Sequence, residues 1–127
     1  MIKDYKELIV WQKAMDATVE IYRLVKLLPK EETYALSDQM RRAAVSIPSN
    51  IAEGQSRNSS KDYARFLAMA KGSRAELETQ LLLCVRVGYL TNDDISVVID
   101  LLSEISKIIN AIQRKLTPPP SSLLPLP

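Results

Sequence analysis

The stretch from Leu36 to Arg57 reads LSDQMRRAAVSIPSNIAEGQSR, and its spacing decides the fold class. Its apolar residues recur at steps of three and four, which is typical of one buried face of a helix. They are Leu36, Met40, Ala43, Ala44, Ile47 and Ile51. Pro48 stands inside this pattern, where it removes a backbone donor and favours a kink or a local opening. A helix with an interior proline must recover about 3 kcal/mol from tertiary packing, so we interpret this stretch as the central helix of a bundle.

The composition is that of an ordinary globular domain. The chain has 127 residues, of which 46% are hydrophobic and 25% charged, and its formal net charge is +2. Its glycines number only three, and the seven prolines concentrate near the C-terminus, so few helix breakers interrupt the body of the chain. The sequence has no apolar run of about eighteen residues and no signal-peptide core. We therefore expect a cytoplasmic protein with no membrane association.

Three further helices are predicted from the same periodicity. Residues 5–28 form the first, the third begins at Ser59 or Ser60, and the fourth begins near Thr91. The inward seam of the first helix is expected at Leu8, Trp11, Met15, Thr18, Tyr22 and Val25, widened by Ala14, Ile21 and Leu28. The third helix is expected to bury Tyr63, Phe66, Leu67, Ala70, Leu77, Leu81 and Cys84. The fourth is expected to bury Ile95, Val98, Leu102, Ile105, Ile109, Ile112 and Leu116.

Residues with known capping preferences mark the helix ends. Ser37 is the expected N-cap of the central helix, and Gly54 and the polar residues after it bring that helix to its end. Ser59 with Asp62, and Thr91-Asn92-Asp93-Asp94, have the spacing of capping boxes. Gly88 is the expected C-cap of the third helix.

Four amphipathic helices with short connections predict an all-α protein, an antiparallel up-down-up-down four-helix bundle over residues 1–117. A three-helix core whose last helix is exchanged between subunits is the alternative. Residues 118–127 are predicted to form a Pro-rich mobile tail.

The residue types needed for common enzyme mechanisms are scarce. The sequence has no histidine, and Cys84, its single cysteine, lies on an apolar helix face, where a cysteine packs as a small hydrophobe. The histidines or multiple cysteines that histidine-dependent nucleophiles and transition-metal sites require are therefore missing, and no cofactor or metal is expected. Asn50 and Glu53 do not suffice as a catalytic pair, because no second acid or base converges on them.

Basic residues concentrate in the middle of the chain. Arg57, Lys61 and Arg65 step by four around the junction of the second and third helices, and Arg41 and Arg42 lie earlier in the same block. We expect such a cluster to contact phosphates, with an attraction that oligomerisation multiplies and salt weakens. The alternative is a solvated bundle end.

The third helix has a second, unusual stripe. Ala68, Gly72, Ala75 and Thr79 lie together on the side away from its core positions. Small side chains at this repeat let another backbone approach closely, which predicts a subunit interface and a homo-oligomer; simple tolerance of small residues at solvent is the alternative. Arg74 falls within the inward stripe and needs a structural ion pair with Glu53 or Glu78.

Three runs carry a resemblance to a known family. LIVWQKA at Leu8–Ala14, QMRRAAVSIPSNIAEG at Gln39–Gly54 and RFLAMAKGSRAELETQL at Arg65–Leu81 resemble the four-helix-bundle family encoded in 23S rRNA intervening sequences. The resemblance implies a homopentamer with no established enzymatic activity. It also implies similarity to the accessory protein of diversity-generating retroelements, a basic pentameric barrel that binds a reverse transcriptase and nucleic acid.

The family motif is matched at Arg41, Arg42, Ser46, Pro48, Asn50, Glu53 and Gly54, and these residues are interpreted as serving packing and assembly. The sequence thus predicts a non-enzymatic homo-oligomer that binds structured RNA or a nucleoprotein through its basic surface. A structural or protein-interaction module without a nucleic-acid role is the alternative.

Overall fold

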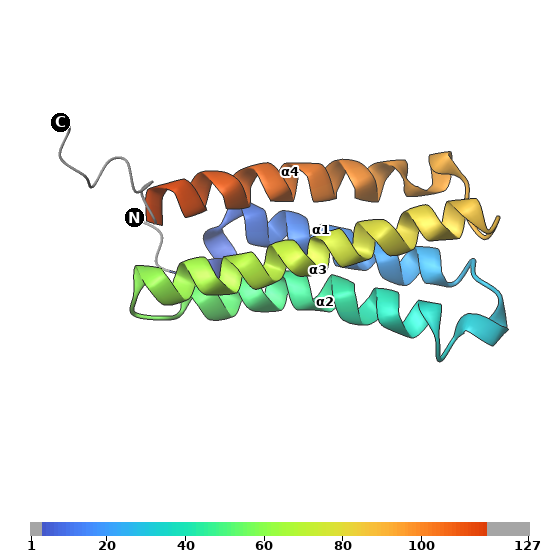
Figure 1. The fold of residues 1–127 in the computed structure, drawn as a ribbon, viewed down its shortest axis with the longest axis horizontal. Helices are drawn as coiled ribbons and strands as arrows, with labels where there is room; N and C mark the ends of the chain where they lie inside the picture. The colour runs from blue at the N-terminus through green and yellow to red at the C-terminus, as the bar shows by residue number, and fades with distance from the viewer. Residues whose placement is uncertain (1–3, 117–127) are drawn as a thin grey trace, which may run out of the picture.

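The computed structural model describes residues 4–116, and these form four long helices that lie side by side (Figure 1). The helices are α1 (Ile9–Val25), α2 (Leu36–Gln55), α3 (Ser60–Arg86) and α4 (Asn92–Leu116). A short 3-10 helix, η1 (Tyr5–Glu7), precedes α1, and another, η2 (Lys30–Glu32), lies in the connection between α1 and α2. The described residues contain no strand, and the predicted all-α fold is confirmed.

The helices run alternately up and down, and the bundle is closed within one chain. The α2–α3 turn lies at one end of the bundle, and the α1–α2 and α3–α4 connections lie at the other (Figure 1). Helix α2 packs between α1 and α3, and α4 packs against both α1 and α3 on the opposite side. Helices α1 and α3 are therefore diagonal partners, and α4 completes the core of its own chain.

The core consists of apolar side chains that the four helices point inward. Its largest fully buried members are Ile21, Leu24, Met40, Ile47, Ile51, Leu67, Leu77, Leu81, Leu102, Ile105, Ile109 and Val10. The inward residues predicted for α3 and α4 agree with this core, except that Tyr63, Ile112 and Leu116 are only half-buried.

The seam predicted for the first helix is correct only in part: Val25 and the widening residues Ala14, Ile21 and Leu28 are buried, whereas most of the other predicted residues are not. The buried residues of α1 are Val10, Ala14, Ala17, Ile21, Leu24 and Val25. Met15 and Tyr22 are instead 41% and 46% exposed, and Trp11 and Thr18 are half-buried. Both stripes have the same alternation of three and four, so the period alone does not show which of them faces the core. Met15 lies outside the core beside α2, and Trp11 packs against the edge of the core.

Helix α2 continues through Pro48 because α1 supplies the hydrogen bond that the proline removes. In an α-helix the carbonyl of Ala44 accepts from the N–H of residue 48, which Pro48 lacks. The hydroxyl of Thr18 lies 3.1 Å from that carbonyl oxygen and donates to it. Ala44 is 1% exposed, so without Thr18 this oxygen would be a buried acceptor with little access to water.

The helix ends follow the capping rules in part. Thr91 and Asp94 form a complete capping box: the Thr91 N–H donates to Asp94 Oδ2 over 2.8 Å, and the Asp94 N–H donates to Thr91 Oγ over 3.0 Å. Ser59 Oγ accepts from the Asp62 N–H over 3.1 Å. Gly88 has a φ of +88°, the left-handed conformation expected after a helix end.

The start of α2 and the extent of the first helix differ from the prediction. Ser37 is buried inside α2, and the Leu36 N–H donates instead to Glu32 Oε1 over 3.3 Å. The carboxylate of Glu32 in η2 thus caps the start of α2 in place of the predicted Ser37. The first helix is divided into η1 and α1, and α1 ends at Val25, before the proline predicted to stop it.

Candidate interaction surfaces

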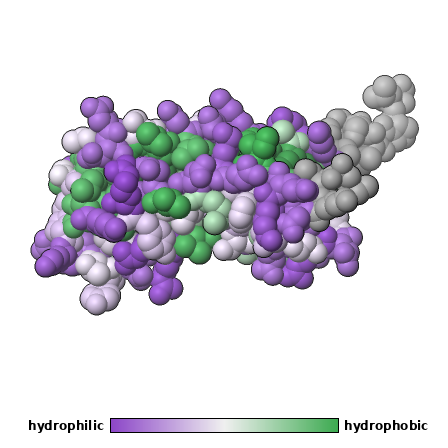
Figure 2. All heavy atoms as spheres, turned by 180° about the vertical axis from the view of Figure 1, so that it is seen from behind, coloured by the Kyte–Doolittle hydropathy of each residue, from purple (hydrophilic) through white to green (hydrophobic). Residues whose placement is uncertain are grey.

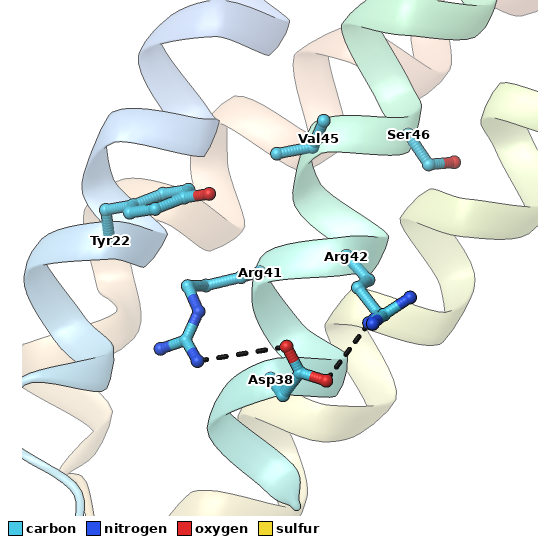
Figure 3. Close-up of a pocket in the computed structure, with 6 residues that line it drawn as sticks. All are labelled: Tyr22, Asp38, Arg41, Arg42, Val45 and Ser46. Atoms are coloured by element: carbon cyan, nitrogen blue, oxygen red, sulfur yellow. Dashed lines mark hydrogen bonds and ion pairs between the residues drawn. The ribbon is translucent and has the colours of Figure 1, made fainter. Parts of the chain in front are cut away.

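Two arginines of the predicted basic surface share one carboxylate. Asp38 lies between Arg41 and Arg42 on α2, with ion pairs of 3.9 Å to Arg41 Nη2 and 3.0 Å to Arg42 Nε (Figure 3). Arg41 also donates to the Thr33 carbonyl over 3.2 Å. Tyr22 of α1 faces this group and lines a shallow pocket with it (Figure 3). The charge of these two arginines is therefore partly neutralised.

The other three predicted basic residues gather around the α2–α3 turn. The guanidinium groups of Arg57 and Arg65 lie 4.9 Å and 4.6 Å from the centre of the Phe66 ring, which is within cation–π range. Phe66 is only 6% exposed, and the two guanidinium groups are among the groups that cover its ring. The structure thus brings Arg57 and Arg65 together, and it leaves Lys61 exposed on the first turn of α3.

Acidic neighbours also offset this second group. Arg57 lies 3.3 Å from Glu53, and Arg65 lies 3.7 Å from Asp62. Both pairs are exposed, so water and salt screen them and each stabilises the fold by less than about 1 kcal/mol. A phosphate can compete for such arginines, but the field of this bundle end is weaker than the basic residues alone suggest.

The residues predicted as an oligomer interface lie on the outer face of α3. Ala68, Gly72, Ala75 and Thr79 are all exposed. A Cβ atom built on Gly72 would meet no atom within 4 Å, so this glycine serves no packing need inside the single chain. The face continues into Leu82 and Leu83, which are 49% and 47% exposed. The outer face of α3 is therefore low in charge over several turns.

Three residues of the family motif lie where α2 packs on α3. Ser46 and Ser73 share a hydrogen bond between the two helices, and the side-chain amide of Asn50 donates to Ser46 Oγ over 3.2 Å. Gly54 permits the closest approach, because a Cβ there would lie 2.7 Å from the Cβ of Phe66. These contacts, with the buried Pro48, hold α2 against both of its neighbours.

Glu53 of the family motif and Arg74 of α3 do not pair with each other. Glu53 pairs with Arg57, as described above. Arg74 lies 3.6 Å from Glu78, one turn further along α3, which decides between the two partners expected from the sequence. The Nε atom of Arg74 is buried and makes no hydrogen bond among the described residues.

A groove that the sequence did not predict lies between α1 and α2. It is lined by Tyr5, Trp11, Met15, Thr18, Val45, Pro48, Ser49 and Ala52 and has a volume of about 380 Å³. Tyr5 and Trp11 form an edge-to-face pair with ring centres 5.4 Å apart. The periodicity of the α1 seam contained the signal, but it was assigned to the core. The view from behind shows how hydrophobic side chains reach the surface between hydrophilic ones (Figure 2).

Cys84 is held inside the bundle as a packing residue. Its side chain is 0% exposed, and its sulfur lies 3.7 Å from the sulfur of Met40. Burial raises the pKa of the thiol above the ordinary value of 9.0 and keeps it protonated at neutral pH. Over residues 4–116, the structure brings together no group of His, Cys, Asp and Glu suited to a metal ion. None of the described helices is long and apolar enough to cross a membrane.

These observations define the class of the protein as a closed antiparallel four-helix bundle with an apolar core and several low-charge outer surfaces. Residues 6–111 match the family described as 23S rRNA-intervening sequence protein, and the chain belongs to this family.

A solved structure agrees with the assignment. A protein of unknown function from the S23 ribosomal protein family of Bacteroides thetaiotaomicron is 29% identical, with a TM-score of 0.77. The similarity covers 84% of the present chain and 99% of the other. No curated protein matches the sequence.

Proposed function

We propose that the protein is a non-enzymatic, homo-oligomeric four-helix bundle that acts in the cytoplasm through its outer surfaces. The observation that supports this most is the outer face of α3, where the exposed stripe Ala68, Gly72, Ala75 and Thr79, followed by Leu82 and Leu83, carries no charge. Contiguous apolar surface on a folded protein marks a binding surface more often than a solvated one. Five copies is the number that the family resemblance implies.

The chemistry of the chain supports a binding role over a catalytic one. The sequence contains no histidine, and its single thiol is buried and protonated. The arginines of the described surface pair with carboxylates on their own or a neighbouring turn, as stabilising surface ion pairs do. The outer surface of the bundle therefore supplies apolar area of a defined shape, which suits binding.

The substitution Gly72→Leu tests the oligomer. Gly72 has open space around its Cα, so the single chain accepts a leucine, whereas a close-packed interface does not. We expect the mass measured by light scattering to fall toward the 14.3 kDa of one chain. Ser103→Leu, at an exposed position of α4, is the matched control and leaves the mass unchanged. An unchanged mass for Gly72→Leu would remove the α3 face from the proposal.

A second function, binding of structured RNA or a nucleoprotein through the basic surface, is supported by the gathering of Arg57, Lys61 and Arg65 at one end of the bundle. In an oligomer this end is repeated once per copy, which strengthens its attraction for phosphates. Arg41 and Arg42 would add to it. The alternative is a protein-interaction module that does not bind nucleic acid.

A salt titration with a structured RNA hairpin separates these two functions. Phosphate contacts predict an affinity that falls steeply between about 50 and 200 mM salt. Replacing Arg57, Lys61 and Arg65 by glutamate should abolish that binding. The same replacement of Arg23, Lys26 and Lys30, three exposed bases at the opposite end, is the control. Equal binding by the two triple variants, or binding that ignores salt, would contradict the phosphate role of this surface.

A further inference from the structure

The groove between α1 and α2 is apolar for a physical reason. Helix α1 turns Ala14 and Ala17 toward the core, so Met15 stands on the outer side, and the half-buried Trp11 lines the groove at the edge of the core. Val45, 41% exposed, faces them from α2. Both helix surfaces therefore expose apolar atoms to water along several turns, which costs free energy unless another surface covers them.

The groove lies at the same height along the bundle as the outer face of α3. Thr18 is level with Ala44, because its hydroxyl reaches the Ala44 carbonyl. Ser73 is level with Ser46, because their hydroxyls share a hydrogen bond, and Gly54 is level with Phe66. Since α2 and α3 are antiparallel, the strip from Ala68 to Thr79 spans nearly the same stretch as Ala52 to Arg42 on the groove side.

The two surfaces have complementary shapes. The groove is a long hollow with aromatic and aliphatic walls. The outer face of α3 is convex, and its stripe Ala68, Gly72, Ala75 and Thr79 has small side chains, so the helix backbone can enter a hollow closely. Leu82 and Leu83 follow at the end of this strip and supply larger apolar side chains.

Their charges are complementary as well. Lys61 and Arg65 stand on the first turns of α3, at the bundle end where three acidic residues are found: Glu53, Glu7 of η1, and Asp4, the N-cap of η1. Further along α3, the exposed Glu76 is close to the height of Arg42 on the groove side. A copy placed beside another at the same height would thus bring opposite charges together at both ends of the contact.

We propose that the α1–α2 groove receives the outer face of α3 from a second copy of this chain. The inference rests on the proposed self-association and assigns the two surfaces that make it. The surfaces lie on different helices, and α3 is diagonal to α1, so the contact is head-to-tail. Both surfaces lie at one height, so copies that lie parallel are related by rotation without translation along the bundle, which is the condition for closing into a ring instead of growing into a filament.

Two variants, each blocked on one surface, test this assignment. Ala75→Glu places a charge on the α3 face and leaves the groove intact, whereas Val45→Glu places a charge in the groove and leaves the α3 face intact. Both positions are exposed on helices, so both variants should fold, which circular dichroism checks. Val97→Glu, at a position on α4 that is 55% exposed, is the matched control and should keep the full mass.

We expect each blocked variant alone to have the mass of one chain by light scattering, and an equimolar mixture to have twice that mass. The mixture regains one contact because the intact groove of the first variant accepts the intact α3 face of the second. The assignment is overturned if both blocked variants keep the native mass, or if only one of them loses association. A mixture that stays monomeric would overturn it as well. A native chain that is itself monomeric would instead overturn the proposed self-association.

Discussion

The hydrogen bond from Thr18 to the Ala44 carbonyl is expected to compensate for Pro48, and Thr18→Val tests this. Valine keeps the shape of threonine and removes only the hydroxyl. Thr18 Oγ lies 2.8 Å from the Ala14 carbonyl and 3.1 Å from the Ala44 carbonyl, and its one proton serves one of them at a time. The Ala14 carbonyl already accepts the helical N–H of Thr18, so the Ala44 carbonyl alone depends on the hydroxyl.

The size of the effect follows from the burial of that carbonyl. Leaving a buried acceptor without a partner costs about 1 to 3 kcal/mol, and Ala44 is 1% exposed. We therefore expect Thr18→Val to lower the free energy of unfolding by at least about 1 kcal/mol. In a Pro48→Ala background residue 48 has its own N–H for the Ala44 carbonyl, so the same substitution should cost less than about 0.5 kcal/mol.

Urea unfolding of the four proteins of this double-mutant cycle, followed by circular dichroism, measures the coupling between positions 18 and 48. Thr79→Val is the matched control: Thr79 donates to the Ala75 carbonyl over 2.9 Å, an exposed oxygen that also accepts a helical N–H. A repeat at tenfold lower protein concentration separates folding from association, since only association depends on concentration. Equal costs of Thr18→Val in both backgrounds would refute the role assigned to Thr18.

Three further predictions concern packing and titration. Gly54→Ala should lower the free energy of unfolding by about 1 to 2 kcal/mol, because its Cβ would lie 2.7 Å from the Cβ of Phe66; a neutral effect would mean that α2 and α3 are less closely packed. Gly72→Ala should raise the free energy of unfolding of the single chain by about 0.5 to 1 kcal/mol, since alanine has the higher helix propensity and its Cβ has space. A lower melting temperature caused by this substitution in a monomeric variant would contradict the prediction. Burial raises the pKa of Cys84, so the stability that the neutral thiol provides is complete below its ordinary value of 9.0 and is lost as pH rises through the raised pKa. Cys84→Ala should therefore flatten the fall of the urea midpoint between about pH 9 and 10, and equal slopes would exclude this residue as the cause.

The sequence predicted the architecture well because long amphipathic helices carry a strong periodic signal. The Thr91–Asp94 capping box and the left-handed Gly88 depend on local residue types, and both were predicted correctly. The cap of α2 was not, because it comes from Glu32 in the preceding turn, a contact that depends on how the connection folds back.

The orientation of α1 shows the limit of the same signal. Two stripes on this helix share the same spacing, and hydrophobic size favoured the one that contains Trp11 and Tyr22. The core takes Ala17 and Leu24 together with Ala14 and Ile21, which the sequence had placed only at the margin of the predicted seam. Likewise, the role of Thr18 depends on a contact between separate helices, and no local pattern predicts it. The step of four predicted the cluster of Arg57 and Arg65, but it did not predict that both guanidinium groups lie against the Phe66 ring.

Sedimentation equilibrium of the unmodified full chain over a hundredfold dilution range tests self-association most directly. We predict a single species whose mass is a fixed multiple of 14.3 kDa, five according to the family resemblance, with the same mass at the highest concentrations. A mass of one chain throughout would contradict the account, and so would a mass that keeps growing with concentration, because a closed ring has no free surface left to extend it.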